Sequence, residues 1–368
     1  MYSQNDLDEA VASGAMSADA ASGLRNFVEQ QRSLPSVDEE HFRLISGFND
    51  IFVSIAAAIL LFAVGWIGQS IGQATGLRLG DHGPTPFAPA AVAATAWGLA
   101  LFFTAKRRMA LPSILLLLAF VGGVFAAAGF ALVVIVGENT VNNNQVLGGI
   151  LGAAAAAVAA VAAYIHWKRF HVPITVAAGG AAVAAIAVGL LVAAIGDIAN
   201  IRNIILGFVL LLGIGMFLFA MRWDSSDPAR VTRRSDVAFW LHLLAAPMIV
   251  HPVFSLLGLN DGNATIGEGL VVILLYVALG ITALAIDRRA LLVSALAYVL
   301  FALQSLFRQF GAVELNVALT ALVIGSALLL LSAFWHQARR MVVSPLPGAL
   351  RSKLPNLDRV VATPLPAA

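Results

Sequence analysis

The sequence predicts an all-α fold, a polytopic transmembrane helical bundle of about ten spans. The first observation is composition: 60% of the 368 residues are hydrophobic, 11% are charged, and the mean hydropathy is +0.88. A soluble globular domain is about 45–50% apolar and about 25% charged. The second observation is that the apolar residues gather in uncharged runs of about 20, the length of helix that crosses a bilayer core. These features exclude a soluble enzyme and a disordered chain, and the lack of cysteine excludes a secreted disulfide scaffold.

The apolar runs are too long for barrel strands and do not alternate apolar with polar residues, so they predict helices. The ten expected spans are Ile51–Ile71, Phe87–Thr104, Leu111–Val136, Leu147–His166, Val172–Ile195, Asn203–Met221, Val237–Leu257, Gly269–Ile286, Ala290–Phe307 and Val317–Trp335. Basic turns at Lys106, Trp167 and Asp287 each lead into an apolar helix, which fits a helical-hairpin repeat. The general preference of cytoplasmic turns for positive charge explains the same pattern.

The distribution of lysine and arginine predicts the orientation of the spans. With ten spans, 16 of the 22 basic residues lie in the even-numbered connections and the C-terminal tail. Only Arg78, Arg202 and Arg308 lie on the opposite side. By the positive-inside rule, both termini are cytoplasmic. We therefore expect a multi-pass protein of the bacterial inner (plasma) membrane.

Three parts follow from this division. Residues 1–50 form an acidic helical cytoplasmic segment of net charge −6, with a split between two short helices near Ser13 and Gly14. Residues 51–335 form the ten-helix transmembrane domain, and residues 336–368 form a proline-rich cytoplasmic tail that we expect to be disordered. The acidic segment is either a solvated cap or a docking module for a basic cytoplasmic partner, and its small size favours the cap.

The seventh span carries the strongest candidate for a functional site. Pro247 and Pro252 each free a backbone carbonyl, and a kinked helix at mid-membrane is typical of a transporter site. At 100° per residue, Asp236 and His251 share one face, whereas His242 lies about 180° from His251 and ~13 Å along the axis. The two histidines therefore cannot share a metal or a proton. His251 is the better candidate of the two for a buried proton-binding or ligand-binding group. A histidine that only forms a hydrogen bond to a neighbouring helix is the favoured explanation over a catalytic role.

The ninth span carries a second polar stripe, and polar stripes on spanning helices usually face protein or water. We therefore expect the seventh and ninth helices to enclose a small polar cavity. Its expected substrate-binding residues are His251, His242, Asp236, Tyr298, Ser305 and Arg308.

Small residues predict where helices approach closely, because packing drives helix association in lipid. A small-every-fourth pattern on the fourth span consists of Gly148, Gly152, Ala156 and Ala160. The third span approximates one with Gly122, Ala126 and Gly129. The basic loop Asp227–Arg234 is expected to contact anionic lipid or the acidic N-terminal segment.

Several kinds of chemistry have no sequence signature here. No HExxH, Walker loop or GxSxG motif occurs, so we expect no enzyme activity, no cofactor and no metal. No span core holds an acid for a proton or sodium relay, which counts against ion-driven transport. The expected partners are membrane lipids and a small-molecule ligand, not nucleic acid, and the sequence does not fix the oligomeric state.

The helical stretch from Val11 to Arg32, and the stretch from Thr232 through Ala246-Pro247 to His251-Pro252, resemble a family of polytopic bacterial inner-membrane proteins of unknown function. That resemblance implies a short cytoplasmic helical segment followed by many spans, and it implies no activity. The leading functional hypothesis is a small-molecule or lipid permease, because of the kinked seventh helix and the hairpin pattern. The alternative is a non-transporting membrane scaffold or sensor that acts through residues 1–50.

Overall fold

A computed structural model describes residues 11–14, 16–24, 48–228, 230, 232–257, 266–289, 292, 296, 316–355 and 357. The chain divides into two compact units, Met1–Arg43 with Asp358–Ala368, and Leu44–Leu357. In the first unit a turn at residues 13 and 14 precedes a helix over residues 18–24, and the backbone amide of Ala20 donates to Ser17 Oγ at 3.1 Å. The turn lies where the sequence predicts the split between two helices.

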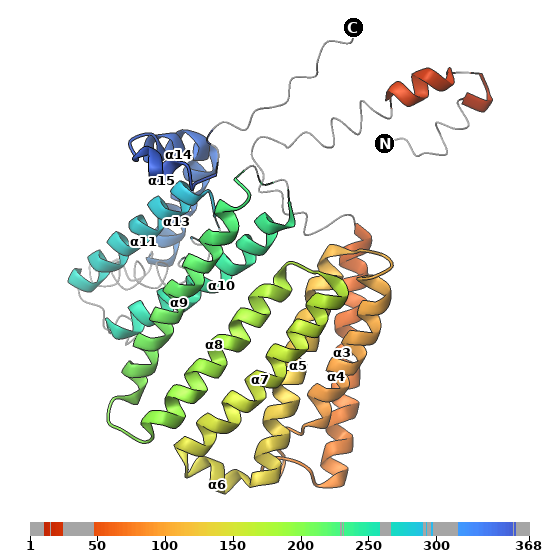
Figure 1. Cartoon of the computed structure of the whole chain (residues 1–368), viewed down its shortest axis with the longest axis vertical. Coiled ribbons are helices and arrows are strands. Elements are labelled where there is room, and N and C mark those ends of the chain that lie inside the picture. The colour runs from red at the N-terminus through yellow and green to blue at the C-terminus, as the bar shows by residue number, and fades with distance from the viewer. Residues whose placement is uncertain are drawn as a thin grey trace. The chain divides into compact units, whose positions relative to one another are not determined.

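The second unit is built from helices, and the described residues contain no strand (Figure 1). The long helices are α3 (Phe48–Thr75), α4 (Phe87–Phe103), α5 (Ala110–Val136), α7 (Gln145–Phe170), α8 (Ile174–Ile195), α9 (Ile201–Ser225), α10 (Arg233–Leu256), α11 (Ile266–Ile286) and α13 (Asn316–Ala333). The short helices are α6 (Glu138–Asn142), α14 (Trp335–Val343) and α15 (Gly348–Arg351).

Six of these helices are long and apolar enough to cross a membrane: α3, α5, α7, α8, α9 and α10. The apolar helices Phe87–Phe103 and Leu274–Ile286 are shorter. The chain is therefore all-helical, and its six apolar helices are those of a multi-pass membrane protein. The expected spans one to eight and the tenth coincide with helices, whereas the ninth, Ala290–Phe307, lies almost wholly outside the described residues.

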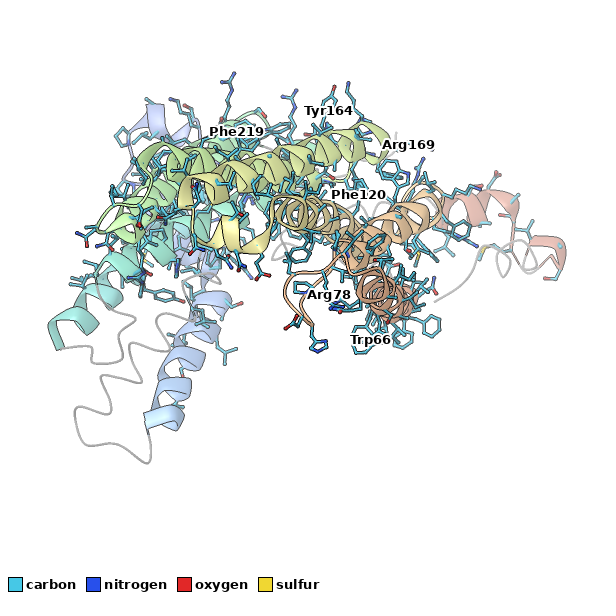
Figure 2. All side chains as sticks on the ribbon, turned by 90° about the horizontal axis from the view of Figure 1, so that it is seen from below. Trp66, Arg78, Phe120, Tyr164, Arg169 and Phe219 are labelled. Carbon is cyan, nitrogen blue, oxygen red and sulfur yellow. The ribbon has the colours of Figure 1, made fainter. Side chains whose placement is uncertain are left out.

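The outer faces of the helices carry the large apolar side chains that a lipid environment allows. On α3, Phe52, Ile59, Phe62 and Trp66 are all more than half exposed. Trp66 points away from the other helices (Figure 2). Such a surface in water would be an aggregation site, and it is the expected surface of a helix that faces lipid.

Neighbours in the chain pack against each other: α3 with α4, α4 with α5, α5 with α7, α7 with α8, and α9 with α10. Successive helices run in opposite directions, so the connections after α4, α7 and α9 lie at one end (Figure 1). We call this the basic end, because these connections and the adjoining helix turns hold nine lysines and arginines. The connections after α3, α5 and α8 lie at the opposite end, with Arg78 and Arg202.

The two ends make their turns with different residues. At the basic end, the left-handed position of each turn is taken by a side-chain-bearing residue: Arg108, His171, Arg230 and Asp287, with φ between 53° and 56°. At the opposite end, glycines 76, 80, 137 and 196 and one asparagine, Asn200, have positive φ. A non-glycine residue in this region costs roughly 1–2 kcal/mol, so the turns at the basic end carry backbone strain.

The α7–α8 interface corrects the predicted register of the small-residue pattern. A Cβ on Gly149 would lie 2.7 Å from the Gly189 carbonyl oxygen, and a Cβ on Gly189 would lie 2.8 Å from the Ala153 nitrogen. A Cβ on Gly152 would meet nothing within 4 Å. The contact face is thus one residue further along the chain than expected. Both registers place a small residue at every fourth position, so the pattern alone could not separate them.

The same displacement occurs on α5. There Gly123 packs against the Pro89 carbonyl oxygen, which a Cβ would approach to 2.8 Å. A Cβ on Gly122, which belongs to the pattern predicted from the sequence, would meet nothing within 4 Å.

The tail also differs from the expectation of disorder from residue 336. Its described part contains α14 and α15, and Arg339 Nη2 donates to the carbonyl oxygen of Pro355 at 2.6 Å. Proline is compatible with a helix start, where its missing N–H costs nothing. Pro347 directly precedes α15, so the prolines here set helix boundaries and do not exclude helices.

Candidate functional site

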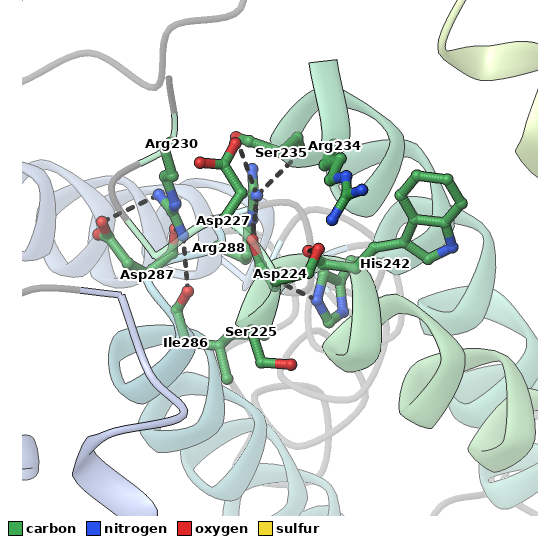
Figure 3. Close-up of polar contacts among 12 residues, drawn as sticks. Asp224, Ser225, Asp227, Arg230, Arg234, Ser235, His242, Ile286, Asp287 and Arg288 are labelled. Carbon is green, nitrogen blue, oxygen red and sulfur yellow. Dashed lines mark hydrogen bonds and ion pairs between the residues drawn. The ribbon is translucent and has the colours of Figure 1, made fainter. Parts of the chain in front are cut away.

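A cluster of buried charged side chains lies at the basic end, where α9 ends, α10 begins and α11 ends (Figure 3). Its aspartates and arginines are almost fully withdrawn from solvent: Asp224, Asp227, Arg230 and Arg288 are each 7% exposed or less. Burying a charge is expensive unless the charge is paired and hydrogen-bonded. Each partner in this cluster is therefore structurally required by the others.

The central pair joins α9 to the residue that follows α11. Arg288 Nη2 lies 2.6 Å from Asp224 Oδ1, and Arg288 Nε donates to Asp224 Oδ2 at 3.2 Å. The same guanidinium donates to the Ser235 carbonyl oxygen at 3.0 Å, at the start of α10. This two-pronged contact fixes both distance and orientation, so one arginine holds the ends of three helices together.

A second pair lies beside the first. Arg230 Nη1 lies 3.0 Å from Asp287 Oδ2, and Arg230 Nη2 donates to the Ile286 carbonyl oxygen at 2.8 Å. On the other side, Trp335 Nε1 donates to Asp287 Oδ1 at 2.8 Å, and Arg339 Nε lies 3.8 Å from the same oxygen. Asp287 thus links the α9–α10 connection to α14.

His242 lies beneath the central pair. It is fully buried, its Nε2 lies 3.4 Å from Asp224 Oδ2, and its ring meets Phe217 edge-on at 5.2 Å. His251 is exposed, and Asp236 is partly buried. The buried histidine of α10 is therefore His242, whereas the sequence predicted His251. The reason is that the side of α10 that carries His242 faces Phe217 and Asp224 of α9.

The structure brings together only part of the predicted site. Tyr298, Ser305 and Arg308, and with them the predicted cavity between the seventh and ninth spans, lie outside the described residues. Sequence reasoning missed Asp224 and Asp287, because both fall just after expected spans, in turns that were interpreted as basic and lipid-facing. The available signal was an acid inside an otherwise basic turn, since such an acid provides an internal partner for arginine.

The cluster is balanced in charge and joins two groups of helices. Arg288 pairs with Asp224, and Arg230 and Arg339 both pair with Asp287. Asp227 accepts hydrogen bonds from Thr232 N at 2.9 Å and from Thr232 Oγ1 at 2.7 Å. Beside it, an apolar cluster packs Ala246 of α10 with Ala283, Leu284 and Ile286 of α11 and Trp335 of α14. We call this whole boundary, between α9–α10 and α11–α14, the seam. Among the described residues no three histidines or acids gather as metal ligands would.

A hollow of about 720 Å³ opens at the opposite end, between α5, α6, α7 and α8. Its rim carries the amides of Asn142, Asn143 and Gln145 and the carboxyl group of Asp197, and Gly149 is part of its wall. This volume is in the range of small-molecule sites, and its few polar groups are of the kind that orient a ligand.

Comparison with protein-family models, with curated proteins and with solved structures finds no match for this chain.

Proposed function

We propose that this protein is a small-molecule or lipid permease of the bacterial inner membrane, without catalytic activity, and that the charge cluster is its cytoplasmic gate. The observation that carries the proposal is the Asp224–Arg288 pair with its neighbours. These ion pairs close the seam between two helix groups at one end of the bundle. The proposal includes ten spans, cytoplasmic termini and membership of the bacterial inner-membrane family that the sequence resembles.

The distribution of charge supports this orientation. The connections at the basic end carry Lys106, Arg107 and Arg108 after α4, and Lys168 and Arg169 in the last turn of α7. The opposite end has far fewer basic residues, and cytoplasmic loops are the ones enriched in lysine and arginine. The basic end is then the cytoplasmic end, and the charge cluster faces the cytoplasm.

An ion-pair gate suits a bundle that must change between two states. A buried pair is stable only when both partners are in place, so the closed state is discrete. Opening requires Asp224 and Arg288 to find other partners, and water entering from the cytoplasm would provide them. Pro247 and Pro252 lie inside α10, and proline permits a helix to bend where it removes a backbone hydrogen bond.

The hollow at the opposite end supports a small-molecule ligand. It lies among α5–α8, whereas the gate lies along α9–α11, so variants in the two places separate binding from opening. Loss of an amide at Asn143 is expected to raise the substrate concentration needed for half-maximal uptake. Loss of Arg288 is expected to change the rate.

The test is uptake by vesicles that contain the purified full chain, with a panel of radiolabelled amino acids, sugars and nucleobases and a fluorescent phosphatidylglycerol. We expect one of these to enter faster than in protein-free vesicles, and Arg288→Gln to change that rate by about tenfold or more. Arg107→Gln, which removes an exposed charge at the same end, is the matched control and leaves the rate unchanged. His251→Ala tests the site predicted from the sequence. If no compound enters with the wild type, the permease proposal is wrong.

A non-transporting scaffold or sensor is the second candidate, and the α7–α8 interface favours it. Alanines and glycines pack there with their backbones in contact, which leaves no room for a pathway between these two helices. Such a protein would act through residues 1–50. Deleting those residues would then abolish its cellular effect, whereas a permease without them still transports.

A further inference from the structure

A hollow of about 430 Å³ lies between the last turn of α9 and the first turn of α10. It is lined by Phe219, Arg222, Trp223, Ser226 and Arg234. Two guanidinium groups, a hydroxyl and two aromatic rings thus meet at the basic end.

The two arginines differ from those of the charge cluster. Arg230, Arg288 and Arg339 are buried and paired, whereas Arg222 and Arg234 are exposed. In the part of the chain that the structure describes, neither Arg222 nor Arg234 forms an ion pair with an acidic residue. Two such guanidinium groups in one hollow favour an anion, and arginine matches the planar two-oxygen face of a phosphate.

An exposed apolar face of α9 leads directly to these arginines. Leu211, Ile214, Leu218 and Phe219 are all exposed, and their spacing of three and four residues places them on one side of the helix. From Leu211 to Arg222 this face extends about 16 Å along the helix axis. It is long enough to hold most of an acyl chain. Trp223 stands at its end, where a tryptophan ring prefers the headgroup region.

From these observations we propose that the hollow binds one anionic glycerophospholipid. Its phosphodiester lies between Arg222 and Arg234, its headgroup hydroxyls reach Ser226, and one acyl chain follows Leu218 and Leu211. The lining of the hollow contains two guanidinium groups and no acid, which favours an anionic lipid over a zwitterionic one with a charged amine. The apolar face favours a lipid over a free phosphate ester. The site does not depend on whether the protein transports anything.

The experiment measures lipid binding to the purified full chain in detergent by native mass spectrometry, with phosphatidylglycerol and phosphatidylethanolamine as probes. We expect phosphatidylglycerol to bind more tightly, and Arg222→Gln with Arg234→Gln to weaken it roughly 30-fold. The control variant, Lys106→Gln with Arg107→Gln, removes two exposed charges from another turn at the same end and changes this affinity less than about twofold. Because all four side chains are exposed, both variants should fold, and a thermal melt checks this.

Two further arms separate the sources of the phosphate and the role of the apolar face. Soluble glycerol phosphate should not compete with phosphatidylglycerol, and Leu218→Ala should weaken the lipid. The proposal is overturned if the control variant loses as much affinity as the arginine variant, because the attraction is then diffuse charge. It is also overturned if phosphatidylethanolamine binds equally well, or if glycerol phosphate competes at the concentration of the lipid.

Discussion

Two interfaces in this molecule join helices by opposite means. Between α7 and α8, glycines and alanines bring two backbones into contact, and Gly149 and Gly189 have no space for a methyl group. Along the seam, buried aspartates and arginines join α9 and α10 to α11 and α14. The first interface consists mainly of small apolar residues, with one buried hydrogen-bonded pair, His166 Nδ1 and Thr175 Oγ1, at 3.2 Å. The second consists of groups that can each exchange one partner for another.

The difference follows from the lipid environment. Lipid tails are as apolar as leucine, so helices there associate by close packing and not by the hydrophobic effect. An interface of small residues therefore has one good arrangement. Paired charges have a closed arrangement and, once water enters, an open one. We infer that the α7–α8 half provides rigidity and that the seam is where the structure changes.

The largest effect is expected at the centre of the seam. Arg288→Gln leaves Asp224 buried without its charged partner, which should lower the free energy of unfolding by about 3–5 kcal/mol. Thermal unfolding of the purified protein in detergent measures this, with Arg107→Gln as the exposed control. A loss of less than about 1 kcal/mol would place the pair among ordinary surface ion pairs.

Replacing both partners tests whether the charges are needed for stability at all. Asp224→Leu combined with Arg288→Met removes the pair together with its desolvation cost, so the double variant should recover most of the stability that Arg288→Gln loses. The same variant should no longer open the seam, because leucine and methionine cannot exchange a buried partner for water. If the losses of the two single variants simply add in the double variant, Asp224 and Arg288 are not energetically coupled.

The α7–α8 interface is expected to respond to size and not to charge. Gly149→Ala forces a methyl group against backbone atoms and should destabilise the protein by about 1–3 kcal/mol. The matched control is Gly152→Ala, three residues away with open space around it, which should be neutral or slightly stabilising because alanine favours helix. If the two substitutions destabilise the protein equally, Gly149 is not at a closer helix contact than Gly152, which would contradict the register seen in the structure.

The smallest effects concern the strained turns at the basic end. Arg108 has φ of 53°, and Arg108→Gly should raise the free energy of unfolding by up to about 1 kcal/mol by relieving the left-handed strain. Asp287→Gly relieves the same strain but removes the contacts to Arg230 and Trp335, so it should destabilise. If Arg108→Gly and Asp287→Gly shift the melting temperature in the same direction, the turn at Asp287 is not held by its side-chain contacts.

Sequence reasoning could predict the class of fold but only part of the site. Uncharged runs of about 20 residues determine helices such as α5 and α8 almost to the residue, because a bilayer requires that length. The site depends on which side of α10 faces α9, and spacing on one helix cannot decide this for His242 and His251. The partner of Asp224 is 64 residues away in Arg288, and only the folded chain shows that the two meet.

The most direct test of the cytoplasmic gate uses the absence of cysteine from this sequence. Ser235→Cys places one thiol beside Arg288 in the cluster, and Arg107→Cys places one at an exposed position of the same end as a control. A membrane-impermeant maleimide is added to inside-out vesicles and to right-side-out spheroplasts. We expect Ser235→Cys to label slowly, from the cytoplasmic side only, and about tenfold faster when Arg288→Gln is added, while Arg107→Cys labels quickly in both backgrounds. Labelling from the outer side alone, or a rate unchanged by Arg288→Gln, would contradict a cytoplasmic gate.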